Sequence, residues 1–141
     1  MADAPVIEWP IEAIPDSAGL FLRVLDINVH SDGTLMPGAI RPTLSDGALS
    51  LDWNKYSTPE DTQQRAQNNP PRRYGVVEFN AGSVRSIDGL SVEHTPDRKT
   101  MNRAHSSLLG LSDSEAQKTK KRNRLIALKP SWRILVTPAR P

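Results

Sequence analysis

The chain of 141 residues contains no cysteine, few aromatic side chains and no long apolar run. Without cysteine it has no disulfide, no thiolate metal site and no thiol nucleophile. No uncharged apolar stretch approaches the ~20 residues that a membrane-spanning helix needs. The first ten residues, MADAPVIEWP, lack the basic and apolar regions of a secretory signal. We therefore expect a cytoplasmic protein that does not associate with a membrane.

Short motifs of several enzyme classes are also missing. The sequence contains no G-x-S-x-G nucleophile elbow, no glycine-rich phosphate loop and no H-E-x-x-H pair. These absences argue against hydrolases, nucleotide-dependent enzymes and zinc proteases that use those motifs. His94, Asp97 and His105 match no familiar metal-ligand spacing. We expect neither a metal nor a cofactor.

What the sequence does contain is enough aliphatic residues for one modest core. Leu, Ile, Val and Phe account for 32 residues, a larger share than disordered chains have. Turn and cap residues separate short periodic segments, with helices expected near 59–67 and 113–128. The prediction is a small single α+β domain with a mostly antiparallel sheet of five or six short strands and two helices. Strand-like segments lie at 20–29, 35–40, 48–53, 74–79, 90–94 and 132–136, and 103–109 fits either element.

Local capping patterns support the helix assignments. Thr58 precedes Pro59, which suits the first position of a helix, and Asn80 can cap one helical turn over 81–87. Ser112 and Glu115 form a capping box that opens the second helix. The two Ser-Asp-Gly sequences, at 31–33 and 45–47, are typical of hairpin turns.

The two ends of the chain have a different composition from the domain between them. Residues 1–19 hold three prolines at a spacing of five, which prevents a regular helix and predicts an extended arm. Its apolar residues, Trp9 and Ile11 among them, suggest that the arm packs on its own domain or docks on a partner protein. The domain is expected over 20–137, and residues 138–141 are expected to fray.

Charge is divided unevenly along the chain. Residues 1–71 carry a net charge of −6, whereas residues 72–141 carry +8. Such asymmetry indicates an acidic partner, unless the two halves neutralise each other within the fold. The densest cations lie in the second predicted helix and beside the Pro-Pro loop. They are Arg72, Arg73, Lys118, Lys120, Lys121, Arg122 and Arg124.

These cations lead to the first functional hypothesis. The helix predicted near 113–128 has few apolar side chains to bury in its first turns and a high density of positive charge. Such a helix can bind the phosphates of a nucleic acid by counterion release, without sequence-specific contacts to the bases. The chain would then be a small non-enzymatic binding module whose basic C-terminal half contacts a nucleic acid or an acidic protein surface. The alternative is a solvated helix whose cations complement the helix dipole.

Two histidines carry the second hypothesis. His94 ends a predicted strand and His105 follows a polar, loop-like segment. A pair of histidines can supply the base and the acid of a metal-independent nuclease or phosphate-handling transferase, with Lys99 or Arg103 holding the phosphate. The competing interpretation is that neighbouring polar groups merely satisfy both rings. Whether the chain is an enzyme therefore stays open.

One cation lies within the most apolar segment, LFLRVLDI. Arg23 could reach into a cleft and hold a phosphate, with a serine of a later strand such as Ser50 beside it. The preferred interpretation is that Arg23 points away from the core and pairs with an acid across the sheet. The third functional hypothesis, an interaction subunit, places Trp9 and Ile11 of the arm on a partner.

Overall fold

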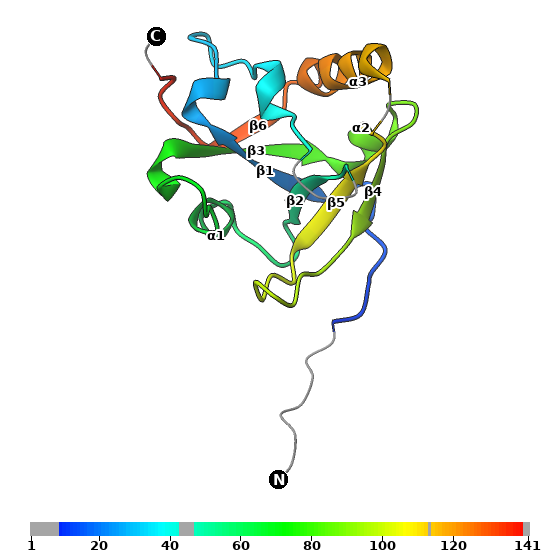
Figure 1. Ribbon diagram of the computed structural model, residues 1–141. Helices are drawn as coiled ribbons and strands as arrows, with labels where there is room; N and C mark the ends of the chain where they lie inside the picture. Colours follow the sequence, from blue (N-terminus) through cyan, green and yellow to red (C-terminus); the bar gives the residue numbers. More distant parts are fainter. Residues whose placement is uncertain (1–8, 43–46, 113, 140–141) are drawn as a thin grey trace.

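Six short strands form one antiparallel sheet in the order β4-β5-β2-β1-β3-β6 in the computed structural model, which describes residues 9–42, 47–112 and 114–139 (Figure 1). Three α-helices and three single 3-10 turns complete the fold, so the predicted α+β class is confirmed. The strands are β1 (Gly19–Leu25), β2 (Leu49–Trp53), β3 (Tyr74–Asn80), β4 (Ser91–His94), β5 (His105–Leu109) and β6 (Ser131–Ile134). The helices are α1 (Pro59–Gln64), α2 (Ala81–Arg85) and α3 (Glu115–Ala127).

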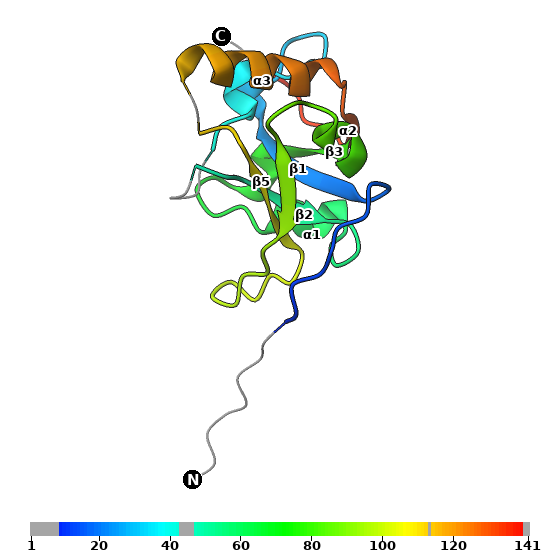
Figure 2. The same ribbon diagram turned by 90° about the vertical axis from the view of Figure 1, so that its right-hand side faces the viewer.

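Side chains on one face of the sheet join the hydrophobic core, and the other face is more polar, although Phe21 is buried there. Leu20 and Leu22 of β1 join the hydrophobic core, as do Leu49 and Leu51 of β2. Helices α2 and α3 cover this face, and α3 contributes the fully buried Leu125. Helix α1 lies on the other side of the sheet from α3, as both views show (Figures 1 and 2).

Pairing between strands is uneven across the sheet. β1 pairs with β3 at seven positions but with β2 at only two, Leu20 with Trp53 and Phe21 with Asp52. Beyond those two pairs, residues of β1 and β2 line a cleft. The sequence does not reveal this seam, because nothing local in β1 or β2 differs from an ordinary strand.

Most helix starts follow the expected capping chemistry, with one correction. The side chain of Thr58 accepts a hydrogen bond from Asp61 N–H, and that of Asn80 accepts one from Ser83 N–H. The cap of α3 is Ser114, which accepts from Gln117 N–H, so the prediction of Ser112 as the cap was wrong. The serine nearer to the helical run is the one that reaches the first-turn amide.

Element boundaries also differ from the prediction. The strand expected over 35–40 is a single bridge between Val29 and Leu35, followed by a 3-10 turn at Pro37–Ala39. Pro37 lacks an amide donor, which removes a ladder hydrogen bond and favours the turn. The ambiguous segment 103–109 provides β5, and the turn expected at 45–47 lies largely outside the described residues. Within the part of the chain that the structure describes, no helix is long and apolar enough to span a membrane.

Candidate functional site

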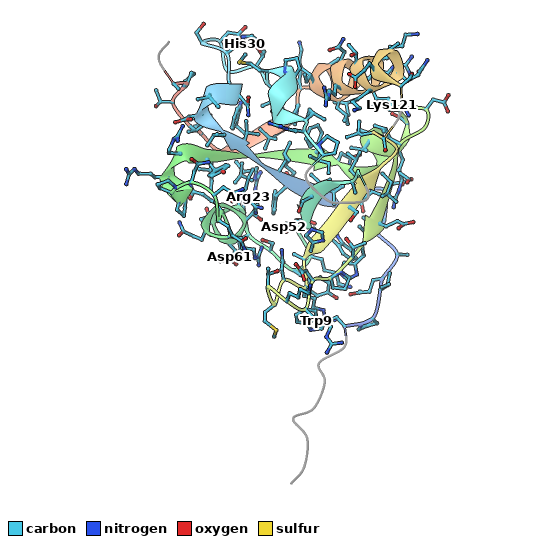
Figure 3. The ribbon with its side chains drawn as sticks, in the orientation of Figure 1. Trp9, Arg23, His30, Asp52, Asp61 and Lys121 are labelled. Carbon is cyan, nitrogen blue, oxygen red and sulfur yellow. The ribbon has the colours of Figure 1, made fainter. Side chains whose placement is uncertain are left out.

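A cleft of about 670 Å³ opens on the polar face of the sheet beside α1. Its walls come from β1, β2, the end of α1 and the two segments that precede β2 and β5. Arg23 and Asp52 lie on this α1 side of the sheet, whereas Lys121 lies on α3 (Figure 3). The side chains on which the argument depends are Arg23, Arg41, Ser50, Asp52, Arg65 and His105, all of which line the cleft.

The period of β2 puts its polar residues in the cleft. Leu49, Leu51 and Trp53 belong to the core, so Ser50 and Asp52 between them face the opposite way. The register with β5 sets Asp52 opposite His105 and Ser50 opposite Ser107. Ser50 and His105, which are 55 positions apart in the chain, are thereby brought into contact.

Ser50 and His105 form the most reactive arrangement in the cleft. Ser50 Oγ lies 2.8 Å from His105 Nε2, and His105 Nδ1 lies 2.8 Å from the carbonyl oxygen of Thr95. A carbonyl only accepts, so in the neutral ring Nδ1 carries the hydrogen and Nε2 is left as the acceptor for the Ser50 hydroxyl. This tautomer is the one in which a histidine withdraws a proton from serine.

The hydroxyl of Thr95 further restrains the histidine ring. It lies 3.0 Å from His105 Nδ1 and 2.8 Å from Ser107 Oγ. The base is therefore held by a third group, as nucleophile–base pairs require, although that group is a backbone carbonyl rather than a carboxylate.

Asp52 is a buried carboxylate that holds the wall of the cleft together. It is only 2% exposed and accepts hydrogen bonds from Thr62, Arg65 and Asn102, each at 2.8 Å. These donors come from α1, its C-terminal cap and the loop before β5. One carboxylate thus fixes two otherwise separate segments beside His105, and its charge is balanced by Arg65.

Two further arginines supply positive charge to the cleft. The guanidinium of Arg23 donates to the carbonyl oxygen of Thr62 at 3.0 Å and points away from the core face. Arg41 is exposed, and among the described residues it has no hydrogen-bond or ion-pair partner. Arg65 forms an ion pair with Asp52. The cations of the cleft that can bind an anionic ligand are therefore Arg23 and Arg41.

His94 has a different environment from His105. Its ring is 1% exposed, accepts from Glu12 N–H at Nδ1 and donates from Nε2 to the carbonyl oxygen of Arg103. It packs edge-on against Trp53 and stacks on Tyr56, on the apolar face of the sheet. The structure does not bring His94 and His105 into one site. Nor does Lys99 line the cleft.

The predicted basic residues are distributed over two regions. Arg73 forms a two-point ion pair with Asp26, whose pKa is lowered by this hydrogen-bonded guanidinium, while Arg72 is exposed. On α3, Lys118 contacts Glu115 and Lys121 donates to the carbonyl oxygen of Gly110. Lys120 and Arg124 are exposed, and Arg122 is half-buried. The α3 cations therefore lie across the sheet from the cleft.

The arm residues proposed for docking are placed as follows. Trp9 is half-buried and Ile11 is 77% exposed, whereas residues 1–8 lie outside the described part of the chain. The following stretch lies on the domain, since Asp16 and Ala18 carbonyls accept from Gly82 and Ala81 amides. At the other end, Ala139 N–H donates to the carbonyl oxygen of Asp26.

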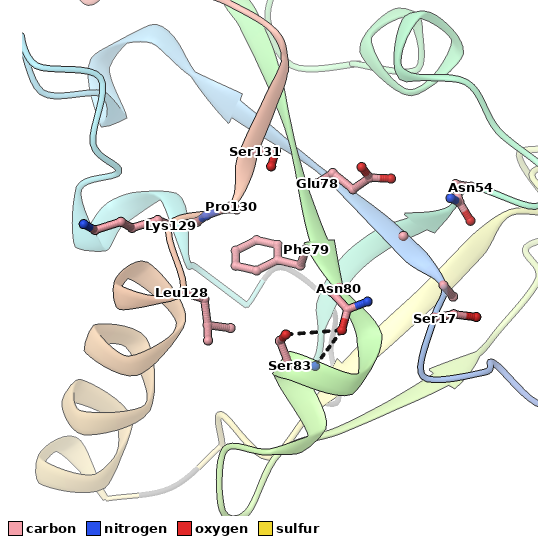
Figure 4. A pocket seen from close by; sticks show the side chains of 12 residues that line it. Ser17, Asn54, Glu78, Phe79, Asn80, Ser83, Leu128, Lys129, Pro130 and Ser131 are labelled. Atoms are coloured by element: carbon pink, nitrogen blue, oxygen red, sulfur yellow. Dashed lines mark hydrogen bonds between the residues drawn. The ribbon is translucent and has the colours of Figure 1, made fainter.

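A second, smaller pocket of about 260 Å³ lies between the end of α3, β3 and α2 (Figure 4). Its most prominent acid, Glu78, lies 3.9 Å from Arg133, and its Asn80 oxygen already caps α2. Its described lining includes no histidine. This pocket therefore offers no serine–histidine pair among its described residues.

Neither metal chemistry nor relatives add to this description. Among the described residues, no group of three histidine or acidic side chains could hold a metal ion. Comparisons with protein-family models, curated protein sequences and solved structures found no match for this chain. The geometry of the cleft is therefore the basis on which a function can be argued.

Sequence reasoning selected His105, and it considered Arg23 and Ser50 together, but it missed the residues that support them. Asp52, Thr95 and Asn102 were not singled out. The alternation of ALSLDW could have identified Asp52 as a companion of Ser50 on one face. No local signal indicates that Asn102 reaches Asp52, fifty residues earlier in the chain.

Proposed function

We propose that the protein is a phosphate-handling enzyme, a nuclease or transferase, in which Ser50 is the nucleophile and His105 the general base. The observation that carries this proposal is the 2.8 Å contact between Ser50 Oγ and His105 Nε2 in an open cleft. The other ring nitrogen is fixed by a carbonyl, so the histidine is held in the tautomer that the reaction needs.

The reaction follows from this pair. Ser50 Oγ attacks the phosphorus of a phosphoester, and its proton passes to His105 Nε2. The bond between phosphorus and the leaving oxygen breaks, and His105 returns the proton to the departing alcohol. Water or a second hydroxyl then attacks the phosphorus and gives its proton to His105 Nε2. The bond between phosphorus and Ser50 Oγ breaks, and His105 returns the proton to Ser50. Attack by water gives hydrolysis, and attack by the second hydroxyl gives transfer.

Charge in the cleft favours a phosphate over a neutral ester. Arg23 and Arg41 line the same cleft, and the charge of Asp52 is already balanced by Arg65. Guanidinium groups bind phosphate oxygens by charge-assisted hydrogen bonds and stabilise charge that develops in the transition state.

The test uses the full chain with bis(p-nitrophenyl) phosphate and a labelled pool of mixed RNA and DNA. We expect turnover that Ser50→Ala and His105→Ala each reduce by about 10²- to 10⁴-fold. His30→Ala is the matched control, because His30 is exposed and outside the cleft. Thermal unfolding checks that each variant folds. Intact mass detects a phosphoryl adduct on Ser50 in the wild type, which keeps one p-nitrophenyl group or a nucleotide chain because the substrates are diesters.

Turnover that survives both Ser50→Ala and His105→Ala would contradict the proposal. So would the absence of turnover and of any phosphoryl adduct on Ser50 with all of these substrates. Loss with Arg23→Ala or Arg41→Ala mainly in KM would locate phosphate binding at these arginines.

Binding of a polyanion by α3 is a second proposal, supported by the exposure of Lys120 and Arg124. The same nucleic-acid pool tests it. We expect affinity to fall steeply with salt, and Lys120→Glu combined with Arg124→Glu to weaken binding without affecting cleavage. Lys121 is left unchanged because it bonds Gly110 in the fold. Affinity that is independent of both salt and this double substitution would contradict it.

A further inference from the structure

Three donors converge on the carboxylate of Glu12 in the N-terminal arm. Lys55 Nζ lies 2.5 Å from Glu12 Oε1, and the hydroxyl of Tyr56 donates to Oε2. Arg103 adds a third contact, with its guanidinium nitrogen 3.8 Å from Oε2. Both oxygens of one side chain are thus met by groups from two separate segments of the domain.

The backbone of Glu12 is recognised as well. Its N–H donates to Nδ1 of His94 at 3.1 Å, and His94 Nε2 donates to the carbonyl oxygen of Arg103 at 2.7 Å. The buried histidine therefore presents a fixed acceptor to the arm. A residue that binds here must supply a backbone amide together with a carboxylate on a side chain of the right length.

Aromatic rings contact the same two cations. The guanidinium carbon of Arg103 lies 4.2 Å from the centre of the Tyr56 ring. Lys55 lies 5.3 Å from the ring centre of Trp53 and 5.2 Å from that of Tyr56. Cations over aromatic faces are stabilised by the ring quadrupole, so these contacts help to position both cations in addition to the ion pairs with Glu12.

Residues on either side of Glu12 contribute little at this point. Pro10, Ile11 and Ala13 are exposed, and Ile11 is 77% exposed. The hydrogen bonds from Lys55 and Tyr56 lower the pKa of Glu12, and the hydrogen bond to Glu12 raises that of Lys55. Glu12 is therefore the only anchor of residues 10–13, whereas Ile14, two residues on, is buried in the hydrophobic core and holds the arm separately. Glu12 binds as a carboxylate.

We propose that Lys55, Tyr56, His94 and Arg103 form a binding site for a glutamate residue of an extended peptide, filled here by Glu12 of the arm. The occupant that displaces the arm is an extended acidic segment of a partner protein. The tethered arm is present at an effective concentration in the millimolar range. A partner segment must therefore bind tightly enough to compete with the arm at that concentration. This site is separate from the Ser50–His105 cleft, and neither proposal depends on the other.

The experiment opens the site in the full chain with Glu12→Ala and supplies the occupant from outside. The probe is a fluorescent peptide with the sequence of residues 9–13, WPIEA, and the control peptide is WPIQA. Both stop before Ile14, whose place in the core is filled by the variant's own arm. We expect Glu12→Ala to bind the glutamate peptide saturably and the glutamine peptide about tenfold or more weakly, as loss of a charged hydrogen bond implies. Wild type binds the same peptide more weakly than Glu12→Ala, because its own arm competes.

Site variants locate the binding. Arg103→Ala or Lys55→Ala, each combined with Glu12→Ala, is expected to abolish selection of glutamate over glutamine, while Lys129→Ala with Glu12→Ala leaves it intact. If Glu12→Ala does not fold, Glu12→Gln keeps the side-chain shape and replaces it. Equal binding of the two peptides, absence of saturable binding at millimolar peptide, or equal affinity for wild type and the opened variant would each overturn the proposal.

Discussion

His94 and His105 lie on neighbouring strands, yet the sheet turns them to opposite faces. His94 is enclosed by Trp53 and Tyr56 on the apolar side, and backbone groups use both of its nitrogens. His105 has one nitrogen fixed by the carbonyl of Thr95 and the other directed at a serine in a cleft. Histidine thus has two roles in this sheet. His94 packs in the core and binds the arm, whereas His105 offers a basic nitrogen in the cleft.

The lesson of this difference is that the partners of a histidine, more than its spacing in the sequence, decide its chemistry. A ring whose two nitrogens both meet backbone groups has no free acceptor for a substrate proton. A ring held at Nδ1 alone keeps Nε2 for a hydroxyl. Three measurements test whether the two faces differ in this way.

The largest effect on stability is expected from His94→Ala. The change removes a fully buried ring with two aromatic contacts and leaves the carbonyl of Arg103 without its donor. We expect the free energy of unfolding to fall by about 3 kcal/mol, measured by chemical denaturation. A loss no greater than that of His105→Ala would contradict the assignment of His94 to the core.

A smaller effect is expected from His105→Ala. The ring is half-buried, and its removal deletes the contacts with Ser50 and with the carbonyl and hydroxyl oxygens of Thr95 beside an open cleft. We expect a loss of about 1 kcal/mol in the same denaturation experiment, accompanied by loss of turnover. Severe destabilisation with unchanged turnover would reverse the roles given to the two histidines.

The smallest effect is expected in the pH dependence of stability, because the pKa values of two carboxylates are lowered in the folded protein. The pKa of Glu12 is lowered by hydrogen bonds from Lys55 and Tyr56, and that of Asp26 by Arg73. A lowered folded-state pKa gives stability that is present above the ordinary values, 4.5 for Glu12 and 3.8 for Asp26, and is lost as the pH falls through the folded values. Thermal unfolding of wild type, Glu12→Gln and Asp26→Asn from pH 7 downwards should converge in acid. Differences that persist in acid would exclude this linkage.

The sequence predicted local features better than spatial ones. Caps at Thr58 and Asn80 and the short strands follow from neighbouring residues, so they could be anticipated. The contact of Ser50 with His105 could not, because it depends on which strands pair and in which register. Likewise, the hydrogen bond that His94 accepts from the Glu12 amide joins residues 82 positions apart.

The narrow joint between β1 and β2 has a mechanical consequence. Two residue pairs connect one half of the sheet, β4-β5-β2, to the other half, β1-β3-β6. Arg23 is on β1 in one half and Ser50 is on β2 in the other half, and both residues line the cleft. A ligand that contacts both Arg23 and Ser50 would link the two halves of the sheet across the joint. We expect the binding of such a ligand to slow amide exchange along the joint.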